Sequence, residues 1–262
     1  MRVEVLLSTM NQSDCSIVKR MNINSDVIVI NQCEKFNYYE ETFNKNKLKM
    51  FSFNEIGVGK SRNSALIRSE ADICLMADDD MRYTDNYKEI VINAFKENPK
   101  ADVILFNVPI NKENKRIIKV KRNQRIRFFN SLKYGTVNIA FRRDRIMKKN
   151  ISFSLLFGGG ARYGCGEDSM FIRECLKQNL RIFSNKEIIA EIDEGESSWF
   201  RGYNEKFFFD KGALFAALAP KISHVLAIQF VLRKRNMFKN SSTVSNALYQ
   251  MFKGIREYKL KA

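Results

Sequence analysis

The stretch that most constrains the fold of this chain is an apolar run that ends in three consecutive aspartates, Asp78, Asp79 and Asp80. The run from Ile73 to Ala77 has the length of a buried strand, and adjacent carboxylates repel one another at neutral pH unless a cation offsets their charge. In an extended chain Asp78 and Asp80 point to one side and Asp79 to the other. Open α/β sheets bind ligands at the carboxyl ends of their strands. The stretch therefore indicates either a site for Mg²⁺ or Mn²⁺ or a solvated acidic loop.

Short apolar segments elsewhere predict an α/β fold with a mostly parallel sheet. We expect strands at 3–7, 27–30, 103–108, 136–141 and 188–192, and helices at 16–21, 61–69, 86–97 and 168–178. Strands that alternate with helices are typical of a parallel sheet with helices on its faces. The first two expected strands run into polar residues, among them Thr9 and Asn31, at their carboxyl ends.

Charge and residue usage narrow the function classes. The net charge of +16 predicts attraction to phosphate groups, nucleic acid or an acidic membrane surface. The five cysteines form no C-x-x-C pair, so a disulfide framework or a zinc site is not expected and a reducing cytoplasm fits best. The only histidine is His224, which excludes a histidine-dependent triad unless His224 itself takes part. The first residues are typical of a strand rather than of a signal peptide.

The segment from Glu55 to Leu66 contains two glycines and a Lys-Ser pair, which suggest a phosphate-binding loop. The Walker pattern requires a glycine where this chain has Asn54, and the dinucleotide fingerprint requires one where it has Arg62, so both are rejected. What remains is a turn that leads into a helix, and helix N-termini attract anions. Arg62 then either contacts a phosphate or a base, or lies in solvent at an ordinary helix start.

A second informative stretch is the loop 158–166, which holds five of the chain's twelve glycines and leads into Glu167 and Asp168. Such a loop is either mobile or passes close to a ligand. A carboxylate at the start of a helix is often a cap. The glycine loop directly before it favours an acid or a base that faces substrate.

Two further regions leave alternatives open. Residues 112–149 are strongly basic, which is usual for a solvated face, and no RNA-binding signature accompanies them. Residues 213–232 are apolar, but Pro220, Lys221 and His224 interrupt them, so a membrane span is not expected. The end of this stretch meets Arg233-Lys-Arg235, and the resulting basic, partly amphipathic segment, Val225 to Arg235, either lies on an anionic membrane or packs against the domain.

Taken in order, these pieces resemble family 2 glycosyltransferases with the GT-A fold. The resemblance rests on the first strand, on Gly57-x-Gly-x-Ser-Arg-Asn63, on the strand into the aspartates and on Gly166-Glu-Asp168, and it extends through Ser198-Trp-Phe200 to residues 211–213. It implies a GT-A domain over residues 1–212, with a donor half at about 1–110 and an acceptor half at about 111–212. Residues 213–262 would form a basic helical C-terminal region.

The resemblance also implies the chemistry. Family 2 enzymes of this kind are inverting and metal-dependent, and they move a sugar from a nucleotide sugar, commonly a UDP-sugar, to a hydroxyl group. The acceptor would be a glycan or a lipid-linked sugar in the synthesis of a surface polysaccharide such as a capsule. The departing diphosphate accumulates negative charge that a bound Mn²⁺ or Mg²⁺ neutralises.

By the same resemblance, each candidate residue receives a role. Asp80 would bind the metal, and Asp78 would assist it or hold the ribose. Asp168 would be the general base, beside an acceptor loop with Gly164, Gly166 and Glu167. Relatives often carry a histidine near the closing segment, where this chain has acids, so a third metal ligand is not identified. The implied nucleotide-binding residues are Thr9, Asn31, Arg62, Asp78 and Asp79.

Two alternatives remain beside the glycosyltransferase. A sugar-phosphate nucleotidyltransferase would share the carboxylates and the sheet, but residues 8–13 show no glycine-rich basic loop after the first strand. A non-enzymatic, basic nucleic-acid-binding protein would fit the charge of +16, although nucleic acid is the less expected partner. We expect a cytoplasmic glycosyltransferase that associates with the inner face of the cell membrane.

Overall fold

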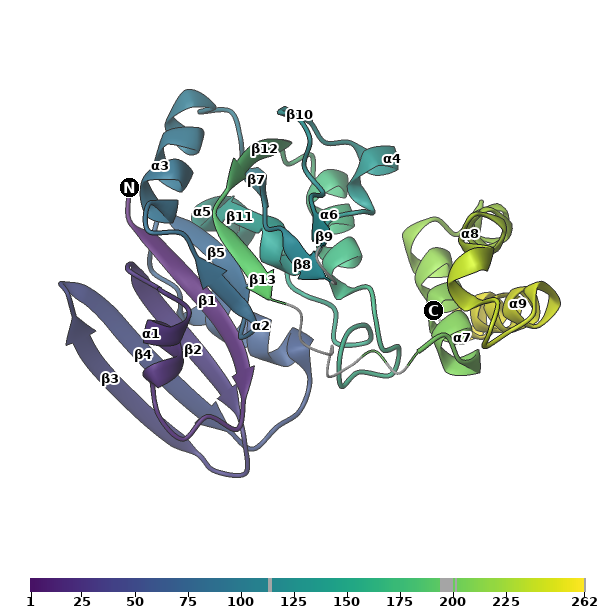
Figure 1. Ribbon diagram of the computed structural model, residues 1–262, viewed down its shortest axis with the longest axis horizontal. Helices are drawn as coiled ribbons and strands as arrows, with labels where there is room; N and C mark the ends of the chain where they lie inside the picture. Colours follow the sequence, from purple (N-terminus) through teal and green to yellow (C-terminus); the bar gives the residue numbers. More distant parts are fainter. Residues whose placement is uncertain (113–114, 194–199, 201, 262) are drawn as a thin grey trace. The chain divides into compact units, whose positions relative to one another are not determined.

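The computed structural model describes residues 1–112, 115–193, 200 and 202–261, and the chain divides into two compact units. Unit 1 comprises residues 1–153 and 171–195, and unit 2 comprises residues 154–170 and 196–262, each as far as it is described. Unit 1 is built on a large sheet with helices on its faces, and unit 2 is mostly helical (Figure 1). The expected fold class, an α/β fold around a mostly parallel sheet, is confirmed.

The main sheet of unit 1 has nine strands among the described residues. Their spatial order is β10 (Gln124–Arg125), β12 (Ile182–Ile188), β7 (Val103–Asn107), β11 (Ile139–Arg142), β5 (Ile73–Asp78), β1 (Val3–Met10), β2 (Asp26–Gln32), β4 (Asn46–Phe53) and β3 (Asn37–Phe43). The neighbours from β5 to β4 are parallel, as are β7 and β12. Strands β3, β10 and β11 are antiparallel to their neighbours.

Helices cover both faces of this sheet. One core forms between the sheet and α1 (Ser16–Arg20) and α3 (Tyr87–Glu97). The other forms against α2 (Val58–Arg68), α5 (Arg143–Lys148) and the later part of α6 (Glu167–Lys177). Strand β1 divides its side chains between the two cores, because successive residues of a strand point to opposite faces. Val5 and Leu7 join the first core and Leu6 joins the second.

A smaller sheet stands beside the large one in unit 1. Its spatial order is β6 (Met81–Tyr83), β13 (Ala190–Asp193), β8 (Ile110–Lys112) and β9 (Lys115–Ile117). The connection from β10 to β11 contains the short helix α4 (Phe128–Ser131) and the 3₁₀ helix η1 (Thr136–Asn138). Strand β6 follows the aspartates directly, so the turn between β5 and β6 joins the two sheets.

Most expected elements are present with shifted ends, but three expectations were wrong or incomplete. Residues 136–138 are a 3₁₀ turn instead of a strand, because the Asn138 side chain accepts from the N–H of Gly135 and donates to the carbonyl of Phe106. The hairpin of β3 and β4 was not expected. Its two-residue turn is formed by Asn44 and Lys45, both with positive φ. Strand β12, before the expected strand at 188–192, was also missed.

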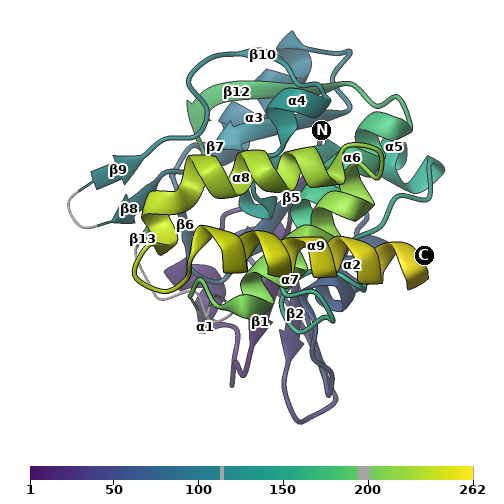
Figure 2. The ribbon, with the colours of Figure 1, turned by 90° about the vertical axis from the view of Figure 1, so that its right-hand side faces the viewer.

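Unit 2 contains three helices among its described residues, α7 (Glu205–Leu218), α8 (Ser223–Phe238) and α9 (Val244–Lys261), with α8 and α9 side by side (Figure 2). The backbones of α7 and α9 touch where glycines allow it. A Cβ atom on Gly212 would lie 2.0 Å from the carbonyl oxygen of Met251, and one on Gly254 would lie 2.0 Å from that of Phe209. Gly212 of the Lys-Gly-Ala segment therefore has a packing role.

The division of the chain differs from the expected boundary at residue 212. Helix α7 begins at Glu205, and the glycine loop belongs to the C-terminal unit instead of the α/β unit. The physical reason is an apolar cluster in which Phe157 and Tyr163 of the loop region pack with Leu214 and Leu218 of α7. Within the described ranges, no helix is both long enough and apolar enough to cross a membrane.

Candidate functional site

The candidate donor site is a row of polar residues at the carboxyl ends of four adjacent parallel strands, β5, β1, β2 and β4. The register places Asp78 of β5 beside Ser8 of β1, and it places Thr9 of β1 beside Asn31 of β2. Asn31 in turn lies beside Ser52 of β4. Neighbouring strands that end together bring these side chains to one edge of the sheet, where α/β folds bind their ligands.

Asp78 is held by a buried arginine. Nη2 of Arg62 in α2 donates to Oδ1 of Asp78 over 2.8 Å, and the arginine side chain is only 3% exposed. The guanidinium also lies over the ring of Phe153, with 5.6 Å from Cζ to the ring centroid, and Phe153 stacks on Phe171 of α6. Arg62 therefore does not lie in solvent, and its role in the present geometry is to orient Asp78.

Asp79 faces the other side of the strand and is held by a different partner. Oγ1 of Thr9 donates to Oδ2 of Asp79 over 2.6 Å. Thr9 is almost completely buried, whereas Asp79 is exposed. The opposite directions of Asp78 and Asp79 agree with the expected alternation. Strand β5 ends at Asp78, however, so Asp80 lies in the turn and strand alternation no longer determines where it points.

The ionisation of Asp80 is perturbed by burial and by its two neighbouring carboxylates. The pKa of Asp80 is raised from 3.8 to about 6, first because protein atoms around its carboxyl group displace water, and then because Asp78 and Asp79 repel its charge. A carboxylate in this state gains from a nearby cation. The same group is solvent-accessible, so a ligand can reach it.

The carboxylates at this edge could hold a divalent metal only together with other ligands. Within the described part of the chain, no three histidine, cysteine or acidic side chains converge to form a complete metal cage. Mg²⁺ and Mn²⁺ need only one or two carboxylates when phosphate oxygens and water supply the other positions. An accessible Asp80 beside Asp78 fits a metal shared with a phosphate-bearing ligand and does not fit a metal held by protein alone.

Asn31 organises the loop after β1. Its Oδ1 accepts from the N–H of Gln12 and its Nδ2 donates to the carbonyl of the same residue, both over 2.9 Å. Nδ2 also contacts Oγ of Ser52 at 3.1 Å. Asn31 is fully buried, so in this geometry it shapes the loop. A pocket of about 930 Å³ lies between this loop, α1 and the β3–β4 hairpin, and Asn31 and Ser52 form part of its lining.

The start of α2 is fixed to the same strand ends. The side chain of Gln32 pairs with both backbone groups of Gly57, donating to its carbonyl and accepting from its N–H, each over 3.2 Å. Gly57 has φ of +135°, a conformation that favours glycine. Ser61 donates to Ser8 over 2.8 Å. These bonds place α2, and with it Arg62, against the strand-end row.

Unit 2 contains the second candidate region, the glycine loop. The loop closes on itself, because Gly158 donates to the carbonyl of Tyr163 and Tyr163 donates to that of Leu156. Gly166 has φ of +107°, and a Cβ atom there would lie 2.5 Å from both methyl groups of Leu214. The glycines therefore allow tight turns and a close approach to α7. This packing accounts for the glycines, and the two expectations, mobility and closeness to a ligand, stay predictions.

A buried carboxylate on α7 holds this loop. Oδ2 of Asp210 accepts from the N–H of Gly164 over 2.8 Å, and Nζ of Lys206 lies 2.7 Å from the same oxygen. Lys206 also donates to the carbonyl of Arg162 over 3.1 Å. The Asp210 side chain is 5% exposed, so its charge depends on these partners.

Glu167 and Asp168 open helix α6 directly after the loop. Both are half-buried and lie in the first turn, where the helix dipole stabilises negative charge. Oδ1 of Asp168 accepts from the N–H of Ser169 over 2.5 Å, and the N–H of Met170 is bonded to the carbonyl of Gly166. Asp168 therefore lies within the first helical turn, beyond the N-cap position.

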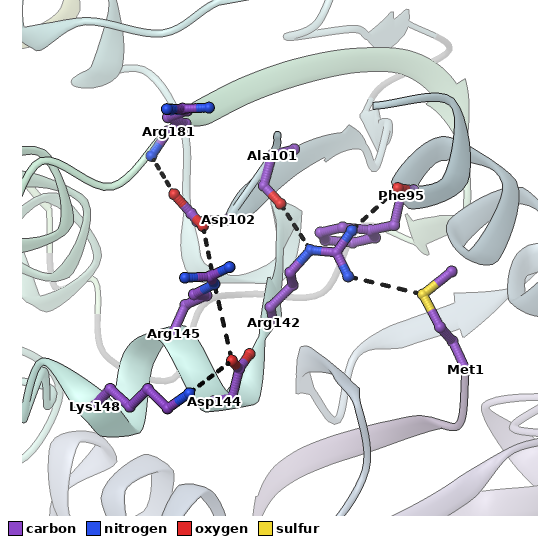
Figure 3. A network of polar contacts seen from close by, with 9 residues as sticks. All are labelled: Met1, Phe95, Ala101, Asp102, Arg142, Asp144, Arg145, Lys148 and Arg181. Atoms are coloured by element: carbon purple, nitrogen blue, oxygen red, sulfur yellow. Dashed lines mark hydrogen bonds and ion pairs between the residues drawn. The ribbon is translucent and has the colours of Figure 1, made fainter. Parts of the chain in front are cut away.

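Two arginines near the end of the basic run 112–149 stabilise the structure of unit 1. Arg142 donates to the carbonyls of Ala101 and Phe95 over 3.0 and 3.1 Å (Figure 3). Arg145 pairs with Asp102 at 3.5 Å, as the same figure shows. These two arginines join β11 and α5 to the rest of unit 1, so their charges are used within the fold.

Sequence reasoning found the aspartates, Thr9, Asn31 and Arg62 that meet in the strand-end row. It missed Ser52 because strand β4 was not recognised, and it missed Phe153 because only the fold places it under Arg62. Asp210 had no local signal. The acids Glu194 and Glu196 and the Ser198-Trp199 pair of the closing segment lie outside the described residues.

Comparisons with known proteins identify the family and the fold. The model of the family described as "Glycosyl transferase family 2" matches residues 4–161. Among solved structures, the chain is similar to S. aureus TarS 1–349, with 17% identity and a TM-score of 0.64 over 98% of this chain and 82% of that chain. The complex of that TarS fragment with UDP-GlcNAc gives 17% identity and a TM-score of 0.65 over 97% and 82%.

A search of curated proteins finds no match. At 17% identity the likeness to TarS shows the fold, which is the GT-A fold expected from the sequence. The family model covers more than half of the chain, from the first strand to the glycine loop. This chain is therefore a member of glycosyl transferase family 2, and it is a glycosyltransferase.

Proposed function

We propose that this protein transfers a sugar from a nucleotide-sugar donor of the UDP-sugar type to a hydroxyl group of a glycan or lipid-linked acceptor, with inversion at the sugar carbon. The observation that carries the proposal is the strand-end row, in which Arg62 holds Asp78 and Thr9 holds Asp79 next to an accessible Asp80. Support for the donor type comes from TarS, a protein of similar fold whose structures include complexes with UDP-GlcNAc and with UDP.

In this proposal the donor lies along the strand-end row. Asp78 and Asp79 contact the nucleotide, and Arg62 and Thr9 fix the direction of each carboxylate by hydrogen bonds that exist before the donor binds. Asn31 shapes the loop at Gln12 on the nucleoside side. Such preorganisation reduces the loss of conformational entropy when the donor binds.

Asp80, assisted by Asp78, would hold Mn²⁺ or Mg²⁺ together with the donor's diphosphate. When bound, the metal would neutralise charge on the departing diphosphate. The raised pKa of Asp80 supports this assignment, because the folded protein has already brought three carboxylates together at a cost in stability.

The acceptor hydroxyl is a weak nucleophile at neutral pH and needs a base. We assign this role to Asp168, whose carboxylate stands in the first turn of α6, after a loop that also carries Gly164, Gly166 and Glu167. Direct displacement breaks the bond between the sugar carbon and the phosphate oxygen while the hydroxyl oxygen bonds to the opposite face of that carbon, and Asp168 takes the hydroxyl proton. One base is sufficient for an inverting transfer.

The proposed donor site is tested by thermal shift with UDP, UDP-GlcNAc and other sugar nucleotides, each with Mn²⁺ or EDTA. A ligand at a hundred times its Kd stabilises the protein by about 2.7 kcal/mol. We expect metal-dependent stabilisation by uridine nucleotides in the wild type and in Asp144→Ala, which removes an exposed carboxylate of α5. The stabilisation should be lost in Asp80→Ala. Equal stabilisation of Asp80→Ala and the wild type would refute the metal assignment, and no response to any nucleotide would refute the donor assignment.

The base is tested separately in Asp168→Asn. This variant should keep donor-induced stabilisation and lose transfer by a factor of about 10² to 10⁴, because the amide cannot accept the proton. The rates of hydrolysis and transfer are measured from the amount of nucleotide diphosphate released. Transfer at the wild-type rate would assign the base to another residue.

A further inference from the structure

We propose that one face of α8 is a docking surface for an anionic lipid bilayer. Three aliphatic residues on this helix remain exposed: Val225 by 64%, Ile228 by 41% and Leu232 by 55%. Their spacing of three and four residues places them on one side of the helix. We call them the α8 stripe.

The α8 stripe is not the face that packs in unit 2. Ala227, Val231 and Phe238 of the same helix are buried in the core that α8 forms with α7 and α9. Helix α8 is therefore apolar on two sides, and only one of them has a partner within the described chain. Figure 2 shows α8 beside α9 along its length. A second apolar face on an outer helix calls for a partner other than its own bundle.

The charges around the α8 stripe identify that partner. Arg235 follows Leu232 by three residues and Lys239 follows it by seven, so both lie on the side of the stripe by helical geometry. Helix α8 contains no aspartate or glutamate. Among the described residues, no acid forms an ion pair with Arg233, Lys234 or Arg235. Aliphatic side chains bordered by unpaired cations match the acyl and phosphate layers of an anionic membrane.

The same charges argue against a second copy of the chain as the occupant. In a two-fold symmetric pair, each α8 stripe would face an identical surface, and the cations of the two copies would come close together without acids between them. A lipid surface supplies the negative charge that this face lacks.

The first test is co-sedimentation with vesicles of phosphatidylcholine alone and of phosphatidylcholine mixed with phosphatidylglycerol. We expect binding to the mixed vesicles at low salt, weak binding at high salt and none to the neutral vesicles, because salt screens the attraction. The triple variant Val225→Ser/Ile228→Ser/Leu232→Ser should lose most of this binding. Its control is Ile67→Ser, which removes an aliphatic residue that is 67% exposed on α2.

The second test separates docking by α8 from attraction by the overall charge. Arg235→Gln/Lys239→Gln removes two cations beside the stripe, and Lys100→Gln/Lys186→Gln removes two exposed cations of unit 1. Each cation near an anionic surface contributes about 1 kcal/mol, so the first pair should lower the partition coefficient about 30-fold and the second should change it little. Equal losses in the two pairs would overturn the proposal.

Two other outcomes would also overturn it. Undiminished vesicle binding by the triple serine variant would remove α8 from the interaction. A wild type that is dimeric by light scattering, with a monomeric triple variant and no vesicle binding in either, would assign the stripe to a second copy. None of these readouts involves a nucleotide, so they stand whether or not the proposed donor site is correct.

Discussion

The strand-end row of unit 1 and the glycine loop of unit 2 both present carboxylates, yet they are built in different ways. In the row, the register of parallel strands brings Asp78, Thr9 and Asn31 to one edge, and Arg62 of α2 holds Asp78 there. In the loop, residues near in sequence form a closed turn that Asp210 fixes to α7.

The difference concerns what each region needs in order to stay in place. The row depends on strand register and on the ion pair between the buried Arg62 and the partly exposed Asp78, so removing one charge disturbs the position of Asp78. The loop depends on backbone hydrogen bonds and on the absence of side chains at Gly164 and Gly166. We therefore expect the loss of one charge to disturb the row more than the loop.

The largest effect is expected for Arg62→Ala in the row. It leaves Asp78 beside two other carboxylates without its cation, and we expect a loss of about 2–3 kcal/mol, at the low end for a buried pair because Asp78 is partly exposed. Urea unfolding measures it. Arg62→Ala/Asp78→Asn should recover part of the loss. If the double variant is no more stable than the single one, the ion pair does not explain the role of Arg62.

A smaller effect is expected for Asp210→Ala in the loop. The N–H of Gly164 loses its acceptor, which costs about 1–3 kcal/mol, while the exposed Lys206 returns to water. Asp210→Asn keeps an acceptor and should cost less. Hydrogen exchange at Gly164 should rise in Asp210→Ala and leave the exchange at Ser8 and Thr9 unchanged. A rise of equal size in both regions would show that the two are not independent.

Gly166→Ala probes the same loop through its backbone. The positive φ costs an alanine about 1 kcal/mol, and the new methyl group forces Leu214 to move. Gly166→Ala/Leu214→Ala should cost less than the sum of the two single changes, because the smaller residue removes the clash. Additive losses in urea unfolding would place the strain elsewhere.

The smallest effect, with the opposite sign, is expected for Asp80→Asn in the ligand-free protein. Folding raises the pKa of Asp80 from 3.8 to about 6, so the charged carboxylate destabilises the fold. This cost is absent below about pH 4, grows as the pH rises and is complete above about pH 6. The variant should therefore melt a few degrees (about 1–3 °C) higher than the wild type at pH 7 and at the same temperature below pH 4.

The control for this prediction is Asp144→Asn in α5, which should show no such gain. A Tm difference for Asp80→Asn that persists at pH 3.5, or that is absent at pH 7, would contradict the assigned origin of the shift. The gain would also illustrate that the row has a cost in stability, which is common where a site is shaped for a ligand.

Local patterns predicted the elements that carry the site but not all of their neighbours. The apolar runs of β1, β2, β5 and β7 were correct because a buried parallel strand is a continuous apolar segment. Strand β4 alternates buried and exposed residues and includes lysines, so it lacked that signal. Its absence from the prediction is the reason that Ser52 was not expected beside Asn31.

By itself, the sequence determined that the chain has an α/β fold and that one central strand ends in three carboxylates. It also determined that a glycine loop precedes Glu167 and Asp168. These are local facts, because strand length, turn residues and helix starts depend on neighbours in the chain. Only the tertiary structure decided that Arg62 is buried against Asp78, that Asn31 holds the loop at Gln12 and that Asp210 fixes Gly164. Those contacts join residues 16 to 46 positions apart, and such pairs are set by strand register and helix packing, which leave no pattern in the adjacent sequence.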